Sequence, residues 1–371
     1  MKKIGIYIHI PFCKSKCPYC DFYSVKVNDE EMDRYVQELN KKFEYYSKDL
    51  ADNDYIVDTV YFGGGTPSTL GTARLVKLLK TINNSFSLAE DVEITMEMNP
   101  TSRGLIDFSI LKEMGLNRLS VGMQSAVDDE MKLLGRNHTQ RDVEYTVRTA
   151  QKCGINNISL DLIIGAPEQT KSTLKQSMDF CNDLGVQHIS AYILKIEEST
   201  PFYKMKENLN LLTDDEQAEQ YLYVCEYLES LGYCQYEISN FAKKCYESRH
   251  NNKYWQCEEY LGIGPSAHSF YKGKRFYYDR NFSYFYDNKT IDDGLGGSKE
   301  EFIMLNLRLK RGLIFKEYKD KYLQNIPEKF INKAKLLSKA GYINLEKEKV
   351  SLTKKGYLLS NTIISELLSC I

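Results

Sequence analysis

The chain has 371 residues, of which 42% are hydrophobic and 27% are charged, with a formal net charge of -2 at pH 7. These values are ordinary for a soluble globular protein with a sizeable core, and the near-neutral charge gives no global attraction to nucleic acid. No stretch reaches the ~18 apolar residues of a membrane span, and Met1–Ile10 is too short for a signal peptide, so we expect a cytoplasmic protein.

The first half of the chain alternates short apolar runs with longer amphipathic stretches. The runs typical of buried strands are Gly5–Ile10, Thr59–Gly65, Val92–Pro100, Arg118–Ser125, Ile158–Pro167 and His188–Ile196. Apolar residues at three- and four-residue spacing predict helices between them, including Glu30–Tyr46, Ala73–Asn83, Arg141–Lys152 and Ser172–Leu184. Six strand–helix units predict an α/β fold with a parallel sheet. Because a closed barrel has eight such units, we expect an open, partial six-unit (β/α) barrel, with a doubly wound sheet as the alternative.

The alternation of apolar runs with amphipathic stretches ends after Ile196, and the sequence indicates three regions. We expect residues 1–235 to form the partial barrel and residues 236–298 to form an aromatic-rich connecting region of loops and short strands. Residues 299–371 read as helices around a short hairpin, an order that resembles a winged helix. Their mixed charge favours packing against the partner domain over binding of nucleic acid.

Three cysteines, Cys13, Cys17 and Cys20, follow the first predicted strand at the spacing C-x3-C-x2-C. A zinc site would need a fourth protein ligand such as His9 or Asp21, although His9 lies in a strand and should be held there. A four-iron cluster held by three thiolates would leave one iron open, which is what a catalytic metal site needs. We therefore expect the missing ligand to come from outside the protein.

Other unusual residues also follow the predicted strands. The run GGGTP (Gly63–Pro67) lets the backbone approach a ligand closely, although a glycine-rich turn alone is often only a turn. Polar side chains lie at or near the ends of the next strands, namely Glu97, Gln124, Arg136 and Asp161. Each of them could be a surface or capping residue. Because the carboxyl ends of parallel strands meet at one edge, together they predict one shared site.

The cysteine motif, with Tyr19 before its last cysteine, resembles the radical S-adenosylmethionine (SAM) superfamily. The resemblance implies a [4Fe-4S] cluster held by Cys13, Cys17 and Cys20, with the amino and carboxylate groups of S-adenosylmethionine on the fourth iron. It also implies that an electron from the cluster cleaves the carbon–sulfur bond of S-adenosylmethionine and yields a 5′-deoxyadenosyl radical. The glycine turn would contact the methionine amino group, and the Glu97 carboxylate would bind ribose hydroxyls.

The segments YIHIPFC, EMNP, GMQS, LGRNH, DLIIGAPEQT and GIGPSAHSF are similar, more narrowly, to the HemN/HemW family. This resemblance covers nearly the whole chain. It implies S-adenosylmethionine contacts at Tyr7, Gly64, Gly65, Thr66, Glu97, Gln124, Arg136 and Asp161. Oxygen-independent coproporphyrinogen oxidases of the family bind a second S-adenosylmethionine, whose neighbours here would be Tyr19, Gly65, Thr66, Gln124, Arg136 and Asp161.

Two features separate the branches of that family. The oxidase branch has a further cysteine where this chain has Phe22, and a longer segment before the position of Tyr7. The haem-chaperone branch carries the motif H-N-x-x-Y-W, found here as His250, Asn251, Tyr254 and Trp255. Imidazole is a common haem ligand and aromatic rings offer flat apolar area to a porphyrin. The same residues also fit an aromatic cluster that docks two domains, with His250 hydrogen-bonded inside it.

The resemblance implies a haem chaperone that binds a [4Fe-4S] cluster, S-adenosylmethionine and haem. Its partners would be haem-dependent client proteins such as respiratory cytochromes, and an electron donor for the cluster. Peripheral membrane association and a homodimer are left open, and no nucleic acid is expected. The alternative is an enzyme, oxygen-independent coproporphyrinogen III oxidase. A radical modification of RNA would be a third function, which the near-neutral charge does not support.

Overall fold

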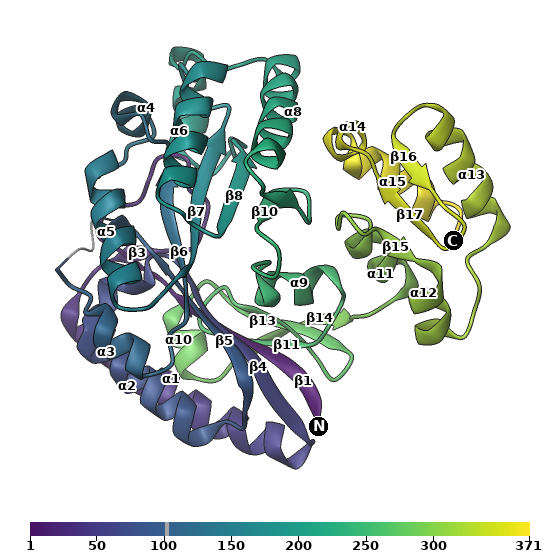
Figure 1. The fold of residues 1–371 in the computed structure, drawn as a ribbon. Helices are drawn as coiled ribbons and strands as arrows, with labels where there is room; N and C mark the ends of the chain where they lie inside the picture. Colours follow the sequence, from purple (N-terminus) through teal and green to yellow (C-terminus); the bar gives the residue numbers. More distant parts are fainter. Residues whose placement is uncertain (101–103) are drawn as a thin grey trace.

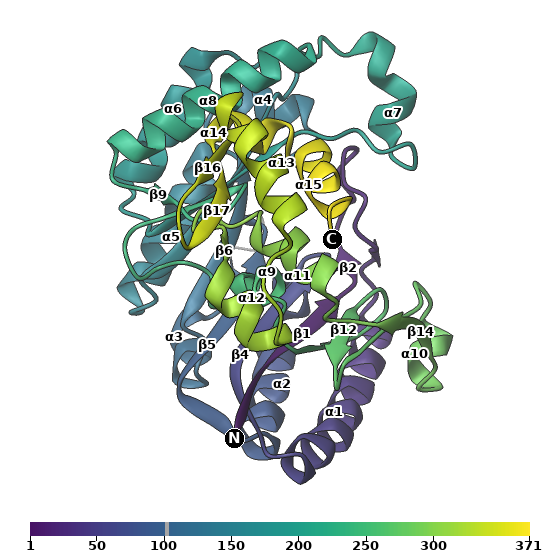
Figure 2. The ribbon, with the colours of Figure 1, turned by 90° about the vertical axis from the view of Figure 1, so that its right-hand side faces the viewer.

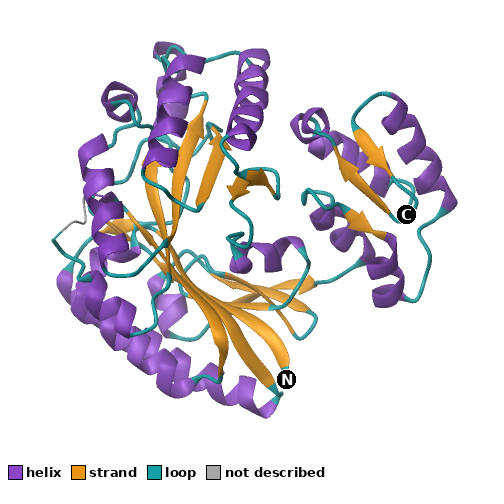
Figure 3. Ribbon diagram, viewed as in Figure 1, coloured by secondary structure: helices purple, strands orange, loops and turns teal. Residues whose placement is uncertain are grey.

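The computed structural model describes residues 1–100 and 104–371. It shows a large curved sheet with helices along its outer face, and a smaller domain formed by the C-terminal residues (Figure 1; Figure 3 shows the same view coloured by secondary structure). None of the helices in the described part of the chain has the length and apolarity needed to cross a bilayer.

The six predicted strands are present and lie side by side in chain order. They are β1 (Lys2–Ile10), β4 (Tyr55–Gly64), β5 (Leu88–Met98), β6 (Arg118–Gln124), β7 (Asn157–Ile164) and β8 (His188–Ile193), all paired in parallel. The connecting helices are α1 (Asp29–Asp52), α2 (Gly71–Ser85), α3 (Phe108–Glu113), α4 (Asp128–Leu133), α5 (Gln140–Lys152) and α6 (Lys171–Asp183). The uninterrupted order confirms the open partial barrel, because a doubly wound sheet reverses its strand order at a switch point.

The inner face of this parallel sheet is polar. In β7, Leu160 and Leu162 are buried against the helices, whereas Ser159 and Asp161 face the other side, where Asp161 accepts a hydrogen bond from Ser120 of β6. The strand register places further polar side chains on this inner face: Tyr7, His9, Thr59, Glu93, Thr95, Glu97, Arg118, His188 and Ser190. Closed barrels of this class are usually filled by bulky aliphatic side chains. This interior therefore depends on hydrogen bonds rather than on apolar packing.

Residues 234–295 extend the sheet at both edges. Antiparallel strands β10 (Asn240–Ala242) and β9 (Cys234–Gln235) follow β8. On the other side β11 (Tyr260–Ile263) pairs in parallel with β1. Beyond it lie β12 (His268–Tyr271), β13 (Lys274–Tyr278), β14 (Thr290–Leu295) and the short helix α10 (Phe282–Tyr286). Helix α9 (Arg249–Trp255) leaves the sheet and packs on its inner side against β4.

The C-terminal domain has the winged-helix order expected from the sequence. It contains α11 (Lys299–Asn306), β15 (Leu313–Ile314), α12 (Phe315–Tyr322), α13 (Glu328–Lys339), β16 (Ile343–Leu345), β17 (Lys349–Leu352), α14 (Lys354–Leu358) and α15 (Ser360–Leu368). In the view of Figure 2 the domain lies in front of the barrel, and its helix α11 contacts α9. Arg308 lies over the Trp255 ring of α9, and Lys354 pairs with Glu229 of α8 (Asp214–Ser230).

A buried ion pair fastens α9 to the barrel and generates a stability prediction. Lys253 of α9 lies 2.8 Å from Asp58 of β4, and both side chains are buried. Lys253→Met would leave the Asp58 carboxylate without its main partner, and we expect a loss of about 3 kcal/mol in the free energy of unfolding, measured by urea denaturation. Lys132→Met, which breaks an exposed pair with Asp129, should cost less than about 1 kcal/mol. Equal losses in the two variants would contradict the assigned role of the buried pair.

Candidate functional site

A cavity of about 380 Å³ opens where the carboxyl ends of the parallel strands meet the cysteine loop. Most of the site residues expected from the sequence line it: Cys13, Cys17, Tyr19, Cys20, Gly64, Gly65, Thr66, Glu97, Gln124, Arg136 and Asp161. These residues come from segments far apart in the chain. The parallel sheet brings them together because successive strands end at the same edge.

The cysteine loop follows β1 and presents its three thiols to this cavity. Cys13 Sγ lies 3.4 Å from the Thr66 hydroxyl, and Arg136 Nη1 donates to Cys17 Sγ at 3.3 Å. The Cys20 amide donates to the Cys17 carbonyl at 3.1 Å, which closes the turn between them. No three Cys, His, Asp or Glu side chains in residues 1–100 and 104–371 meet as a site for one metal ion. Three thiols that line one cavity could each bind a different iron of a cluster.

The two protein groups considered as a fourth ligand are engaged elsewhere. His9 Nδ1 lies 3.0 Å from the Tyr7 hydroxyl and Nε2 lies 3.0 Å from the Tyr23 carbonyl oxygen. Burial lowers the pKa of His9 to about 4, so the ring is neutral. Asp21 accepts a hydrogen bond from the Ser199 hydroxyl. His9 is thus held by its strand, as its position in the sequence indicated.

The glycine turn passes directly beneath the cysteine loop. Gly64 has φ +106°, and a Cβ there would lie 2.4 Å from the His9 ring. A Cβ on Gly65 would lie 2.8 Å from the Ile10 carbonyl oxygen, to which the Gly65 amide donates at 2.9 Å. Larger residues would push the two loops apart. The glycines therefore bring the backbone close enough for Thr66 to reach Cys13.

Glu97 lies near the end of β5, and its carboxylate is held from two directions. The Tyr61 hydroxyl donates to Oε1 at 2.8 Å, and the Gly64 amide donates to Oε2 at 3.2 Å. Burial raises the pKa of Glu97 to about 7, assisted by the charge of Asp161 and opposed by the Tyr61 hydrogen bond. A cationic or hydroxyl-bearing ligand would favour the ionised form.

Asp161 is the second carboxylate on the cavity wall. The Ser120 hydroxyl donates to it at 3.1 Å, and the Ser159 hydroxyl at 3.4 Å. Burial raises the pKa of Asp161 to about 6, although hydrogen bonds from hydroxyl groups oppose this shift. Two carboxyls that titrate near neutral pH thus face one cavity, a pattern that is typical of functional sites.

Gln124 and Arg136 meet over Gly122. Gln124 has φ +73°, a left-handed conformation at the point where the β6–β7 register shifts. A Cβ on Gly122 would lie 3.0 Å from Gln124 Nε2 and 3.1 Å from Arg136 Nη2. Arg136 donates to the Gly122 carbonyl at 2.6 Å, and its buried Nε has no hydrogen-bond partner within the described residues. Strained backbone and an unpartnered buried donor often mark ligand sites.

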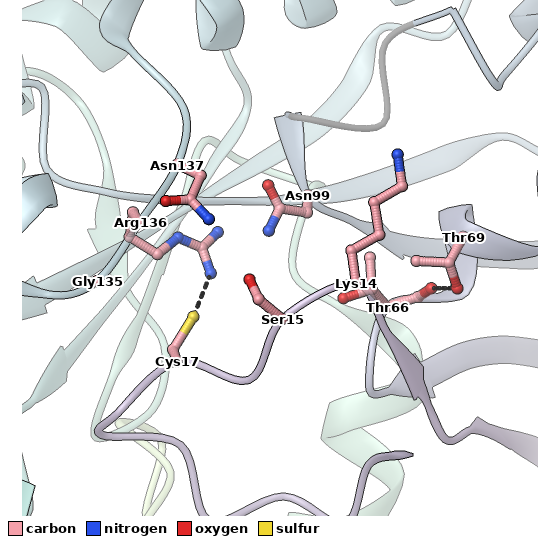
Figure 4. A pocket seen from close by; sticks show the side chains of 9 residues that line it. All are labelled: Lys14, Ser15, Cys17, Thr66, Thr69, Asn99, Gly135, Arg136 and Asn137. Atoms are coloured by element: carbon pink, nitrogen blue, oxygen red, sulfur yellow. Dashed lines mark hydrogen bonds between the residues drawn. The ribbon is translucent and has the colours of Figure 1, made fainter. Parts of the chain in front are cut away.

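A second, smaller cavity of about 130 Å³ adjoins the cysteine loop (Figure 4). It shares Ser15, Cys17, Thr66, Asn99 and Arg136 with the main cavity. Figure 4 shows the Arg136 guanidinium directed at the Cys17 sulfur. The remaining lining is mostly polar and consists of Lys14, Thr69, Gly135 and Asn137.

The structure places the remaining predicted residues away from the main cavity. Tyr7 lies deeper in the barrel beside Tyr61. His250 is completely buried, with Nδ1 2.8 Å from the Thr59 hydroxyl and Nε2 2.8 Å from the Tyr254 hydroxyl. This geometry matches the alternative interpretation of a hydrogen-bonded histidine in an aromatic cluster. Asn251 and Trp255 lie on the same helix, where Trp255 meets the C-terminal domain.

Several cavity residues were missed by the sequence reasoning. They are Ser15, Lys16, Phe22, Met98, Asn99, Ser120, Gly122, Ile163, Tyr192, Ile193, Leu194 and Lys195. Side chains two positions apart along a strand lie on the same face, and this periodicity could have identified Asn99, which comes two positions after Glu97. It could also have identified Ser120, which pairs with Glu97 in the register of β5 and β6. No local pattern in the sequence predicts that the side chains of Tyr192 and Ile193 are exposed at the rim of the cavity.

The raised pKa of Glu97 generates a pH prediction. Between pH 4.5 and about 7 the folded protein keeps a proton that the unfolded chain releases, so Glu97 lowers the free energy of unfolding as pH rises through this window. Glu97→Gln removes the effect. We expect its stability relative to wild type to increase by about 1–3 kcal/mol between pH 5 and pH 8 in urea unfolding of the metal-free protein. Glu90→Gln, on the exposed part of the same strand, should show no such trend. A pH-independent difference for Glu97→Gln would refute the assignment.

Comparison with known proteins agrees with this geometry. Residues 7–181 match the family model described as the radical SAM superfamily, and residues 299–359 match the HemN C-terminal domain. A protein of Bacillus subtilis (strain 168) named heme chaperone HemW is 36% identical, and the alignment covers 98% of each chain. A protein of Lactococcus lactis with the same name is 30% identical over 99% of this chain and 98% of its own.

A solved structure shows the same fold. Coproporphyrinogen III oxidase (HemN) from Escherichia coli superposes with a TM-score of 0.83 at 20% identity, covering 100% of this chain and 91% of that one. At this identity the likeness establishes the fold alone. The identity to the HemW proteins, in contrast, extends over nearly the whole length of each chain and includes both matched domains. The chain belongs to the HemW family within the radical SAM superfamily.

Proposed function

We propose that the protein is a haem chaperone that binds a [4Fe-4S] cluster, S-adenosylmethionine and haem, and that delivers haem to haem-dependent respiratory proteins. One observation carries the proposal: the three cysteines, the glycine turn and the polar strand-end residues line one cavity in a chain that belongs to the HemW family. The names of the relatives support the haem role, and the radical SAM match supports the cluster and its ligand.

The residues of the cavity fit the proposed cofactors. Cys13, Cys17 and Cys20 would hold the cluster as thiolates, and the Arg136 guanidinium next to Cys17 would offset part of their charge. When bound, the cluster supplies the electron that cleaves the carbon–sulfur bond of S-adenosylmethionine. The glycine turn offers close backbone approach, and the unpartnered Arg136 Nε offers a donor.

The two carboxyls would orient S-adenosylmethionine. Glu97 is held by Tyr61 and Gly64 in one position, from which its carboxylate would accept hydrogen bonds from ribose hydroxyls. Asp161 faces the same cavity from β7, and Gln124 presents an amide beside it. S-adenosylmethionine carries a sulfonium and an ammonium group. Its positive charge would stabilise the ionised forms of both carboxyls, whose pKa values are raised without it.

Two places in the structure offer contacts to haem. The H-N-x-x-Y-W motif supplies His250, but ligation of iron by this residue requires its ring to leave Thr59 or Tyr254. The rim of the main cavity offers flat apolar area on exposed Phe22 and Tyr192, with side chains 69% and 44% exposed. We include contact with haem at both the H-N-x-x-Y-W motif and the cavity rim in the proposed function.

The cluster prediction concerns the number of thiolates. Replacing Cys13, Cys17 or Cys20 with Ala leaves two cysteines in the loop, so each variant should lose the cluster after anaerobic reconstitution. The wild type should bind about four iron and four sulfide per chain, measured by metal and sulfide analysis. Cys245→Ala, an exposed cysteine outside the loop, should behave as the wild type. Stoichiometric zinc without iron uptake would contradict the cluster.

The haem prediction separates a chaperone from an oxidase. Haem added to the reconstituted protein should give a stable Soret band, whereas incubation with reductant, S-adenosylmethionine and coproporphyrinogen III should give no protoporphyrinogen. Phe22→Ser removes flat apolar area from the cavity rim and should weaken haem binding several-fold. Multiple turnovers of coproporphyrinogen would assign the enzyme function instead, and absence of any haem affinity would refute the chaperone function.

A further inference from the structure

Helix α9 lies on the inner side of the sheet, and none of its residues lines the main cavity. Its first two amides, of Arg249 and His250, donate to the Glu93 carboxylate at 3.2 and 3.1 Å. Glu93 lies in β5 four residues before Glu97, and so on the same face of the strand. The buried pair of Lys253 with Asp58 holds the next turn of the helix. The helix is therefore fixed to the strands whose other ends form the cavity.

A continuous set of contacts links His250 to the cavity floor. The His250 ring stacks on the Tyr61 ring, with centroids 5.2 Å apart and planes at 27°. The Tyr61 hydroxyl donates to Glu97 at 2.8 Å. Gly63 leaves room for this arrangement, since a Cβ there would lie 2.9 Å from Tyr61 and 3.0 Å from Glu97. The His250 ring thus sets the position of the Tyr61 ring, and the Tyr61 hydroxyl sets the position of the Glu97 carboxylate.

The His250 ring itself has little freedom. Thr59 and Tyr254 engage its two nitrogens, and the side chain is 0% exposed. Burial lowers its pKa to about 3, so the ring is neutral and donates from only one nitrogen. Tyr254 is in turn fixed edge-to-face against Tyr260 of β11, 4.5 Å away. The ring is a rigid support rather than a mobile side chain.

We propose that His250 is a positioning residue of the cofactor cavity, which holds Tyr61, and through it the Glu97 carboxylate, in the geometry that binds S-adenosylmethionine. This inference rests on the proposed binding of S-adenosylmethionine at Glu97. It assigns to the H-N-x-x-Y-W motif a role in the barrel that is separate from contact with haem. The flat ring supports Tyr61 by stacking on it, and the two ring nitrogens hold the ring in place through Thr59 and Tyr254.

The proposal has a consequence for haem. A haem iron takes a His250 nitrogen only after the bond to Thr59 or Tyr254 is broken, which also disturbs the stack on Tyr61. Binding effects between two sites are reciprocal. S-adenosylmethionine and haem ligated by His250 therefore oppose each other in this protein.

The experiment compares His250→Ala with His250→Phe in the full chain carrying its reconstituted cluster. The dissociation constant of S-adenosylmethionine is measured by anaerobic equilibrium dialysis, and haem binding is followed by the Soret band. We expect His250→Ala to weaken S-adenosylmethionine binding about tenfold, because a hydrogen bond to a charged group loses its alignment. His250→Phe keeps a flat ring against Tyr61 and should stay within about threefold of wild type. His268→Ala, at an exposed histidine stacked on Tyr277, is the matched control and should have no effect.

A second pair of variants tests the route through Tyr61. Tyr61→Phe removes the hydroxyl that holds Glu97 and should weaken binding as much as His250→Ala. The double variant should be no weaker than the weaker single variant, since both act on one contact. If His250→Ala does not fold, Thr59→Val, which removes one anchor of the ring, should weaken binding about threefold.

The possible failures are distinguishable. Wild-type affinity in His250→Ala or, where that variant does not fold, in Thr59→Val would overturn the inference, and so would a Phe variant as weak as the Ala variant. A shifted Soret band with unchanged affinity for S-adenosylmethionine would make His250 a haem ligand only. No binding of S-adenosylmethionine by the cluster-loaded wild type would refute the proposed function itself.

Discussion

The polar groups on the inner face of the parallel sheet are held largely by hydrogen bonds to one another, and the rest of the structure depends on this network. A buried polar group without a hydrogen bond costs about 1–3 kcal/mol. Much of the interior is joined by hydrogen-bonded chains: Asp161 accepts from Ser159, Ser159 meets His188 at 2.7 Å, and His188 meets the Tyr236 hydroxyl at 2.8 Å. Thr95 Oγ1 and two guanidinium nitrogens of Arg118 have no hydrogen-bond partner among the described residues. Toward the other end of the strands the same face opens into the cavity. The interior is thus completed by protein at one end and is available to a ligand at the other.

The electrostatics of the open end follow from the same polar interior. Glu97 and Asp161 are held by neutral hydroxyl and amide donors, so burial dominates and raises the pKa of each. Arg136, by contrast, is directed at the cysteine loop through its contact with Cys17. The protein supplies positive charge near the thiols through Arg136 and near the carboxyls through Arg118, whose lowering effect on the two carboxyl pKa values is smaller than the effect of burial. A cationic ligand whose charge lies toward the carboxyls would stabilise their ionised forms.

Helix α9 connects this interior to the rest of the molecule. Its buried side carries His250 and Lys253, which complete the barrel, and its C-terminal end carries Trp255, which lies beneath Arg308 of the C-terminal domain. A short motif whose residues resemble a haem-binding signature therefore occupies the junction of barrel and C-terminal domain. The burial of His250 in this motif is explained by its hydrogen bonds to Thr59 and Tyr254 and by its stacking on Tyr61.

The sequence by itself determined the features that depend on local chemistry or on chain order. Helices α5 and α6 lie where the spacing of apolar residues placed them, and Gly154 and Gly185, with φ of +82° and +69°, lie two residues beyond their ends. The order of the strands and the gathering of the cysteine loop with Glu97 at one sheet edge followed from successive right-handed crossovers. Only the tertiary structure decided that β11 to β14 extend the sheet beside β1, that Arg136 reaches Cys17, and that His250 is buried. These depend on long-range contacts, such as the 191 residues between Thr59 and His250, and on burial, which no local pattern of residues encodes.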